Sequence, residues 1–201
     1  MEDKILHKAA EMFLSQGFKS VTMDDIAQEM GISKKTIYTH FETKLKLVEM
    51  VTYFLFDVIH KGITEIQSRN LNVIEELFVI KDFAMQNLKD EKSSPVFQLQ
   101  KYYPKIYKKV HGQQIKLMTA CVTDNLERGI ATGFYRPKIK VCFVSKIYYM
   151  CTMGIKNPEI FPPHDFIIKD VTSDYLDYHL RAIATPQGLE ILQQFTNEKE
   201  G

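Results

Sequence analysis

The sequence predicts an all-α protein with a small N-terminal three-helix domain and a larger C-terminal helical domain. Apolar residues recur at intervals of three and four along most of the 201-residue chain, which is the spacing that places them on one face of a helix. Glycine, asparagine and proline interrupt this pattern where one helix gives way to the next. The run Val141–Val144 has a strand-like composition, but helical spacing continues beyond it and favours a helix.

The first helix is expected over about Glu2–Gln16. Ile5, Ala9 and Phe13 are spaced four residues apart, so they form one apolar stripe along it. Gly17 follows directly and suits a helix end, because glycine adopts the backbone conformations that other residues avoid there.

The segment TMDDIAQEMGISKKTIYTHFETK, residues 22–44, predicts two short helices joined by a tight turn. Thr22 suits the N-cap of the first of these helices, and Asp25 three residues later can complete a capping box. Gly31 suits the left-handed residue after that helix, and Ser33 suits the N-cap of the next. Two short helices in this relation form a helix-turn-helix, whose second helix enters the major groove of duplex DNA.

The second short helix is predicted to have an apolar face and a polar face. Ile37 and Phe41 are four residues apart and anchor the helix, so its basic, hydroxyl and aromatic side chains point outward. Such side chains bind phosphate oxygens and base edges, although the solvated face of an ordinary helical hairpin is the alternative interpretation. The predicted DNA contacts are Thr22, Ser33, Lys34, Lys35, Thr36, Tyr38, Thr39, His40 and Lys44.

A characteristic series of residues runs through the first helix and this segment: Ile5-Leu6, Ala9-Ala10, Phe13, Gly17-Phe18, Val21-Thr22, Ile26-Ala27, Gly31-Ile32-Ser33, Thr36-Ile37-Tyr38, His40-Phe41 and Lys44. With it, residues 5–48 resemble the DNA-binding domain of the TetR family of bacterial transcriptional regulators. Many members have glycine where this chain has Lys35, so the chain carries an additional charge there. The resemblance implies a homodimer on a pseudo-palindromic operator, a small-molecule effector, and repression that the effector relieves.

Seven further helices are expected beyond residue 43. Asn70 and Asn72, the polar segment KDEKSSP at residues 89–95, and the proline-rich segment 157–164 are expected to separate some of them. Two domains follow, residues 1–46 for DNA binding and residues 47–201 for ligand binding and dimerisation. The expected helices cover about 44–67, 73–88, 96–109 with a kink or division at Pro104, 113–132, 137–154 with Pro137 in its first turn, 165–184, and 189–195, which Thr185-Pro186 opens.

The last two long helices are apolar on more than one face, which predicts a second partner besides their own core. An isologous interface with the same helices of a second copy would provide that partner. The predicted interface residues are Phe143, Ile147, Tyr148, Met150, Tyr175, Tyr178 and Leu180.

The middle helices offer candidate walls for the effector pocket that the resemblance implies. Plain core packing is the alternative for each of these residues. The stretch Tyr102–Lys109, with its lysines and aromatic residues, fits either a second nucleic-acid contact or a solvated helix face. The candidate pocket residues are Met85, Phe97, Tyr102, Tyr103, Tyr107, Met118 and Cys121.

Composition describes an ordinary globular protein with a local basic patch. The formal net charge is only +1, but residues 31–46 hold four lysines against one glutamate. The three cysteines form no CxxC pair, the chain opens with the acidic Met1-Glu2-Asp3, and no apolar run reaches the roughly 18 residues of a membrane span. These features predict a cytoplasmic protein without a membrane segment.

The sequence predicts no catalytic residue, metal ligand or cofactor. The six histidines are scattered, and no HExxH, GxGxxG, P-loop or GxSxG motif occurs. The resemblance implies the function of a ligand-responsive transcriptional repressor. The alternative is a constitutive DNA-binding or protein-interaction regulator of the same fold that lacks a small-molecule inducer.

Overall fold

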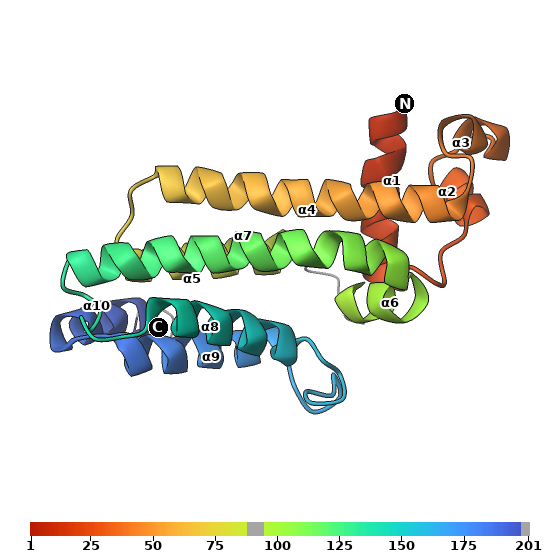
Figure 1. Cartoon of the computed structure of the whole chain (residues 1–201). Coiled ribbons are helices and arrows are strands. Elements are labelled where there is room, and N and C mark those ends of the chain that lie inside the picture. The colour runs from red at the N-terminus through yellow and green to blue at the C-terminus, as the bar shows by residue number, and fades with distance from the viewer. Residues whose placement is uncertain (88–94, 198–201) are drawn as a thin grey trace. The chain divides into compact units, whose positions relative to one another are not determined.

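The protein is helical throughout the part that the structure describes. The computed structural model describes residues 1–87 and 95–197, and within these ranges it contains helices and no strand (Figure 1). An isolated bridge pairs Tyr135 with Ala184. The predicted all-α class is confirmed.

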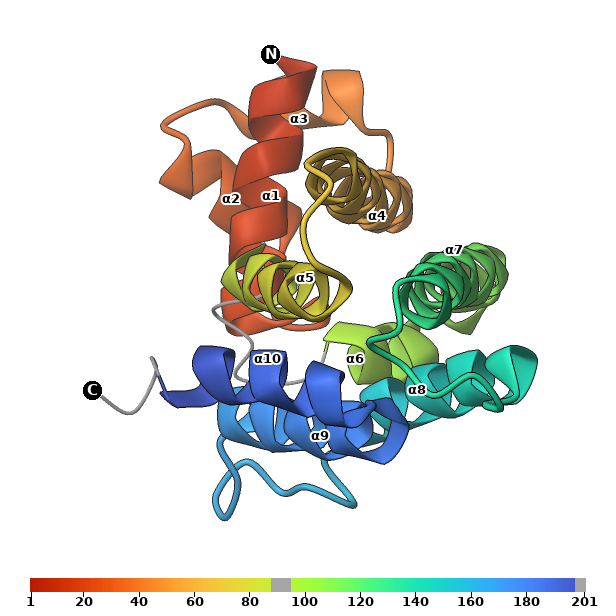
Figure 2. The same cartoon turned by 90° about the vertical axis from the view of Figure 1, so that its left-hand side faces the viewer.

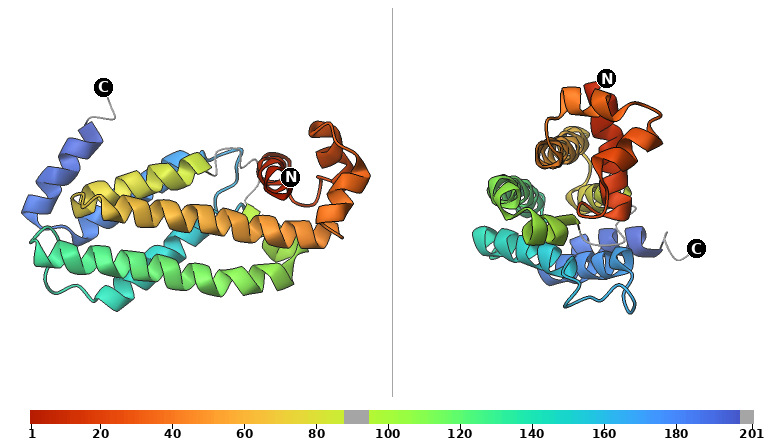
Figure 3. Two further views of the ribbon diagram at one scale, coloured as in Figure 1. Left: turned by 90° about the horizontal axis from the view of Figure 1, so that it is seen from above. Right: turned by 90° about the vertical axis from the view of Figure 1, so that its right-hand side faces the viewer.

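The first four helices agree with the predicted ones. Their bounds are Glu2–Gln16 for α1, Met23–Glu29 for α2, Lys34–His40 for α3 and Lys44–Ser68 for α4. Figures 1 and 3 show α2 and α3 as two short helices near the N-terminal end of α4, and α2 contacts both α1 and α3. This agreement follows from local signals, since glycine ends and hydroxyl caps act within a few residues of the helix ends that they define.

The chain divides into two compact units. The first comprises residues 1–61 and the described part of 88–114, and the second comprises residues 62–87 and the described part of 115–201. The predicted domain boundary after residue 46 therefore lies inside the first unit. Both α4 and the long helix α7 (Pro104–Ala131) contain residues of both units.

One hydrophobic core holds the first unit together. α1 contributes the predicted stripe of Ile5, Ala9 and Phe13, all of them buried. The head, which comprises α1, α2 and α3, buries little apolar surface by itself because it is small, so α4 completes the core. The α4 residues in this core are Leu47, Val48 and Val51, and each is fully buried.

The structure corrects the prediction for residues 96–132. Pro104 divides two helices as expected, because α6 covers Pro95–Tyr102 and α7 begins at Pro104, where a missing N–H costs no helical hydrogen bond. The break expected near residues 110–112 does not occur, and α7 runs through Gly112 to Ala131. Glycine weakens a helix interior without ending it when the residues on both sides continue the helix. Residues 89–94 of the predicted loop lie outside the described residues.

The second unit contains α5 (Val73–Asn87), α8 (Val141–Ile155), α9 (Ile168–Ile183) and α10 (Pro186–Asn197). Figure 2 shows α10 alongside α9, and α9 also contacts α8 and α5. Because α9 has three helical neighbours in this unit, much of its surface is covered.

Two helix starts in the second unit differ from the prediction, and the start of α10 agrees with it. Pro137 lies in a turn rather than in a first helical turn, and α8 begins four residues later. α9 begins at Ile168 rather than at Asp165, which belongs to a turn closed by its N–H bond to the Pro162 carbonyl. α10 begins at Pro186 because Thr185 Oγ1 caps it, accepting a hydrogen bond from the N–H of Gly188 at 3.2 Å.

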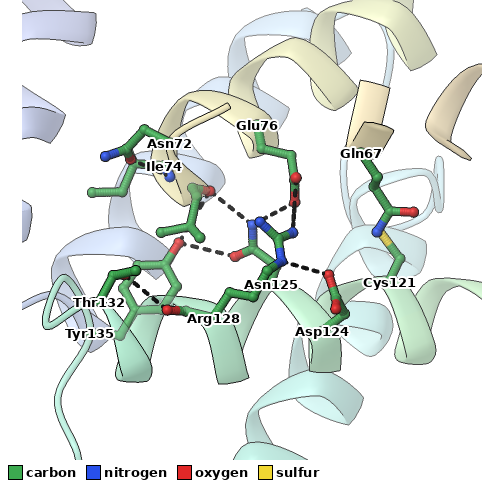
Figure 4. Close-up of polar contacts among 11 residues, drawn as sticks. Gln67, Asn72, Ile74, Glu76, Cys121, Asp124, Asn125, Arg128, Thr132 and Tyr135 are labelled. Carbon is green, nitrogen blue, oxygen red and sulfur yellow. Dashed lines mark hydrogen bonds and ion pairs between the residues drawn. The ribbon is translucent and has the colours of Figure 1, made fainter. Parts of the chain in front are cut away.

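A buried polar network joins α5 to α7 (Figure 4). The carboxylate of Glu76 is fully buried, and Nη2 of Arg128 lies 2.6 and 2.8 Å from its two oxygens. Nδ2 of Asn125 donates to Glu76 at 2.9 Å and to the Val73 carbonyl at 2.8 Å, and the Tyr135 hydroxyl donates to Oδ1 of Asn125 at 3.1 Å. The buried charge is thus paired and hydrogen-bonded, which is the condition under which such a group is tolerated in a core.

The two glycines of α7 predict opposite effects of an added methyl group. Nothing lies within 4 Å of a Cβ built on Gly112, so Gly112→Ala should raise the free energy of unfolding by about 0.5–1 kcal/mol through helix propensity. A Cβ on Gly129 would overlap the buried ring of Tyr135, so Gly129→Ala should lower it by about 1–3 kcal/mol. Urea denaturation followed by circular dichroism measures both variants. Equal stability of Gly129→Ala and the unmodified protein would show that this ring does not pack on α7.

Candidate nucleic-acid interface

Caps at both ends build the turn between α2 and α3. Thr22 Oγ1 accepts a hydrogen bond from the N–H of Asp25 at 3.1 Å, and the Asp25 carboxylate accepts one from the N–H of Thr22 at 2.8 Å. These bonds confirm the predicted capping box and hold the pKa of Asp25 below its usual range. Gly31 adopts a φ of 64° after α2, and Ser33 Oγ accepts a hydrogen bond from the N–H of Thr36 at 3.1 Å as α3 begins.

Two apolar side chains hold α3 to the first unit. Ile37 is fully buried and Phe41 is 2% exposed, whereas Tyr38 between them is 41% exposed. The predicted orientation of α3 is therefore confirmed, while contact with DNA stays a prediction. The outward-facing and exposed side chains are Lys34, Lys35, Tyr38, Thr39 and His40.

The two lysines at the start of α3 have different surroundings. Nζ of Lys34 lies 2.8 Å from the carboxylate of Asp24, and this hydrogen bond raises the pKa of Lys34. Within the described part of the chain, Lys35 is exposed and forms no ion pair. An exposed ion pair contributes little stability and is screened by salt, so a phosphate can replace Asp24 beside Lys34. Lys35 offers its charge without breaking any contact.

The hydroxyl groups also differ in what they can offer a nucleic acid. Thr39 Oγ1 donates to the Lys35 carbonyl at 2.8 Å, so its proton is used and its methyl group and lone pairs remain. The hydroxyl oxygens of Ser33 and Thr36 lie 2.8 Å apart and bond to each other. Thr22 Oγ1 accepts a hydrogen bond in the capping box, which leaves its proton available to donate to a phosphate.

Lys44 has a structural role that no local pattern reveals. Its Nζ donates to the carbonyl oxygen of Lys19 at 2.9 Å and so joins the start of α4 to the segment before α2. Burial lowers the pKa of Lys44, and the nearby Asp25 carboxylate opposes this shift. The two bonded residues are 25 positions apart, so no local sequence pattern predicts the contact. An ammonium group has three donors, so a phosphate contact stays available to Lys44.

Comparison with known proteins finds the same head elsewhere. A model of bacterial regulatory proteins of the tetR family matches residues 5–51, which include both caps, Gly31 and both anchors of α3. Residues 5–51 are thus similar to the DNA-binding domain of the TetR family. The matched range contains the caps of α2 and α3 and most of the buried core residues of the first unit.

Two TetR-family relatives and one solved structure extend the comparison. IcaR of Staphylococcus aureus, the negative transcriptional regulator of the biofilm operon icaADBC, is 32% identical over 78 residues, which cover 39% of this chain and 42% of IcaR. The transcriptional repressor KstR2 of Mycolicibacterium smegmatis is 25% identical over 195 residues, which cover 92% of each chain. The complex of SmeT from Stenotrophomonas maltophilia with triclosan has a TM-score of 0.71 at 13% identity over 92% of each chain, so it shares the fold.

The predicted dimer residues lie in the second unit and fall into three groups. Leu180 is fully buried in the core of this unit, so its placement at an interface is wrong: apolar character alone does not distinguish a core side chain from an uncovered one. The other six can reach solvent to different extents. Phe143, Met150 and Tyr178 are 62%, 60% and 73% exposed, and Ile147, Tyr148 and Tyr175 are half-buried.

A groove of about 730 Å³ lies between α8 and α9. Its lining includes four of the residues predicted for the dimer interface, namely Phe143, Ile147, Tyr175 and Tyr178. It also includes His179 and the basic residues before α8, which the sequence analysis did not single out. Their grouping depends on how α8 packs against α9, so spacing along the chain does not reveal it.

The candidate pocket residues fall into the two separate units. Tyr103 donates its hydroxyl to the Phe18 carbonyl at 3.3 Å, and burial raises the pKa of the Cys121 thiol to about 12, so both have structural roles. Their joint role as an effector pocket stays a prediction. Phe97, Tyr102, Tyr103 and Tyr107 belong to the first unit, and Met85, Met118 and Cys121 belong to the second.

The described residues contain neither a candidate metal site nor a membrane-spanning helix. These residues contain no group of three or more histidine, cysteine, aspartate or glutamate side chains that could hold a metal ion. Over the same residues, no helix combines the length and the apolar character that crossing a bilayer requires.

The two faces of α3 predict opposite sensitivities of the fold. Phe41→Ala should lower the free energy of unfolding by roughly 3–5 kcal/mol, because the ring is buried in the core of the first unit. Tyr38→Ala should change it by less than about 1 kcal/mol, because the ring is largely exposed. Urea denaturation of the two variants makes the comparison. A larger loss in Tyr38→Ala than in Phe41→Ala would mean that the faces are assigned the wrong way round.

Proposed function

We propose that this protein is a transcriptional repressor that binds a pseudo-palindromic DNA operator as a homodimer and releases it when a small molecule binds. The observation that carries the proposal is the orientation of α3, with Ile37 and Phe41 buried behind it and its basic and polar face exposed. A helix held in this way can enter the major groove without disturbing the core. IcaR is a negative transcriptional regulator and KstR2 is a transcriptional repressor, which supports repression over activation.

Affinity for DNA is expected to come from phosphate contacts at the start of α3. Lys35 is the strongest candidate, since its charge is exposed and unpaired among the described residues. Lys34 exchanges its ion pair with Asp24 for one with a phosphate, and the hydroxyl proton of Thr22 adds a neutral donor. Base readout falls to side chains farther along the helix, such as Tyr38 and His40.

Dimerisation is expected to use the face formed by α8 and α9. Phe143, Met150 and Tyr178 are large apolar or aromatic side chains that stay exposed in the second unit. Burial of such surface against another copy would favour association. Two copies related by a two-fold axis would present two α3 helices, which fit successive major grooves when they lie about 34–36 Å apart. The homodimer therefore explains both the uncovered face and a two-part operator.

Release by a small molecule is supported by one structural neighbour, SmeT, whose solved structure holds triclosan. An effector can change operator affinity only if it binds two states of the protein unequally. In this chain α4 and α7 are continuous helices with residues in both units, so a shift in the second unit is carried to the first along the helices themselves. Effector and operator should then weaken each other's binding reciprocally.

The salt dependence of operator binding tests the role of Lys35. The operator is first selected from genomic DNA fragments, and Lys35→Gln is then compared with the unmodified protein by fluorescence polarisation across a salt series. Loss of one phosphate contact should weaken binding and reduce the slope of log affinity against log salt by about one unit. Lys116→Gln removes the same charge from the second unit and serves as the control. Equal slopes for Lys35→Gln and the control would contradict the proposed contact.

The oligomeric state tests the α8–α9 face. Tyr178→Asp places a charge on an exposed aromatic position and should raise the dimer dissociation constant by about thirtyfold or more. Lys169→Asp is the matched control, because nine residues place it about 180° away around α9. Sedimentation velocity over a concentration series gives both constants. A monomer in the unmodified protein, or equal dimerisation of the two variants, would remove this face from the model.

A further inference from the structure

Lysines at the end of α6 and the start of α7 occupy positions that helix stability does not favour. Residues 95–114 contain four lysines and no aspartate or glutamate. Lys105 lies in the first turn of α7, which holds no acidic residue, and the positive end of the helix dipole disfavours a cation there. Lys108 lies three residues further along the same face, so the two charges repel each other. An anion from outside the helix would relieve both effects.

The structure pairs one of the four lysines and leaves the other three exposed. Nζ of Lys109 lies 2.6 Å from the carboxylate of Glu49 in α4. Lys101, Lys105 and Lys108 are exposed, and they form no ion pair within the described part of the chain. Lys101 and Lys105 lie on either side of the one residue that separates α6 from α7. Three unpaired charges within eight residues give this surface a positive potential.

The exposed ring of Tyr102 brings a lysine from another part of the chain to this surface. Nζ of Lys19, in the segment between α1 and α2, lies 4.9 Å from the centroid of the Tyr102 ring, and Nζ of Lys101 lies 5.6 Å from the same centroid. The faces of an aromatic ring attract ammonium groups, so the ring holds two like charges near each other. The α6–α7 patch consists of Lys19, Lys101, Lys105 and Lys108.

Contacts within the first unit hold this patch to the helices that precede it. Leu99 of α6 and Ile106 of α7 are buried in the same hydrophobic core as the two anchors of α3. The Tyr103 hydroxyl donates to the Phe18 carbonyl at 3.3 Å, which joins the α6–α7 connection to the end of α1. The patch and α3 therefore belong to one packed body.

The net charge of the first unit depends on the segment that carries the patch. Residues 1–50 hold seven lysines against eight aspartates and glutamates, so their formal charge is −1. With the four lysines of residues 95–114, the two segments together hold eleven lysines against the same eight acids, a charge of +3. Phosphate contacts supply much of the affinity of a protein for DNA. The α6–α7 segment thus provides attraction that α1, α2 and α3 lack as a group.

We propose that the α6–α7 patch binds the phosphate backbone of the same DNA duplex that α3 contacts. The inference rests on the proposed DNA-binding function and adds a second contact area to it. The Lys19 carbonyl accepts a hydrogen bond from Lys44, a predicted DNA contact, so the patch adjoins the proposed DNA-binding face. The rings of Tyr102 and Phe97 already have lysine ammonium groups over them. They are therefore less suited to stacking on the unpaired bases of a single strand, which favours the duplex as the partner.

The salt dependence of operator binding tests the patch. Lys101→Gln combined with Lys105→Gln removes two exposed charges and no ion pair among the described residues. Loss of two phosphate contacts should weaken binding about tenfold or more and reduce the slope of log affinity against log salt by about two units. Lys116→Gln combined with Lys169→Gln removes two exposed lysines of the second unit and is the matched control. Equal slopes for the two double variants would overturn the proposal.

Ethylation interference on the selected operator distinguishes the patch from α3. An ethyl group on a phosphate removes its charge and blocks contact, so each contacted phosphate gives a signal. The variant Lys101→Gln with Lys105→Gln should lose signals at phosphates where Lys35→Gln retains them. If the two variants lost the same signals, the patch would have no contact area of its own and the proposal would fail.

Two further probes separate the patch from the proposed repressor function: a labelled duplex of unrelated sequence and one of its single strands. If no operator can be selected, but the patch variant binds the unrelated duplex more weakly than the control does, the repressor function is contradicted and the patch is supported. Operator binding with equal slopes for patch variant and control supports the repressor function and overturns the patch. Tighter patch-dependent binding of the single strand than of the duplex would also overturn it.

Discussion

The burial of Ile37 and Phe41 is the constraint on which the position and the exposed face of α3 depend. α3 has only seven residues, and an isolated helix of that length is not stable in water. It persists because Ser33 caps it and because two side chains, four residues apart, place one face in the core. Since those contacts fix the helix from behind, the exposed face contributes little to folding and is free to serve recognition.

The local features of this head follow from the sequence because each depends on residues a few positions apart. The capping box of Thr22 and Asp25, the left-handed Gly31 and the cap at Ser33 are all of this kind. The features that were not predicted join distant residues. Lys34 reaches Asp24 across ten positions, and no periodicity encodes an ion pair of that range.

In the second unit, too, the features that depend on distant contacts were the ones that the sequence did not predict. Leu180 and Tyr178 both occur in one amphipathic helix, yet one is fully buried and the other is 73% exposed, and composition alone gave both the same role. The predicted break near Gly112, within α7, was wrong because a glycine costs helix stability without ending the helix. The buried carboxylate of Glu76 could not be anticipated either, since Asn125 and Arg128 meet it from 49 and 52 positions away.

The charges around Lys35 show how the exposed face of α3 can gain a positive charge without a loss of stability. Asp24 already neutralises Lys34, so the additional lysine at position 35 raises the positive charge of α3 at a point where no carboxylate offsets it among the described residues. Repulsion between neighbouring exposed lysines is weak in water and is screened by salt, so the fold tolerates the extra charge. A polyanion instead gains a full ion pair with released counterions. In the proposed function, position 35 therefore adjusts affinity for DNA almost independently of stability.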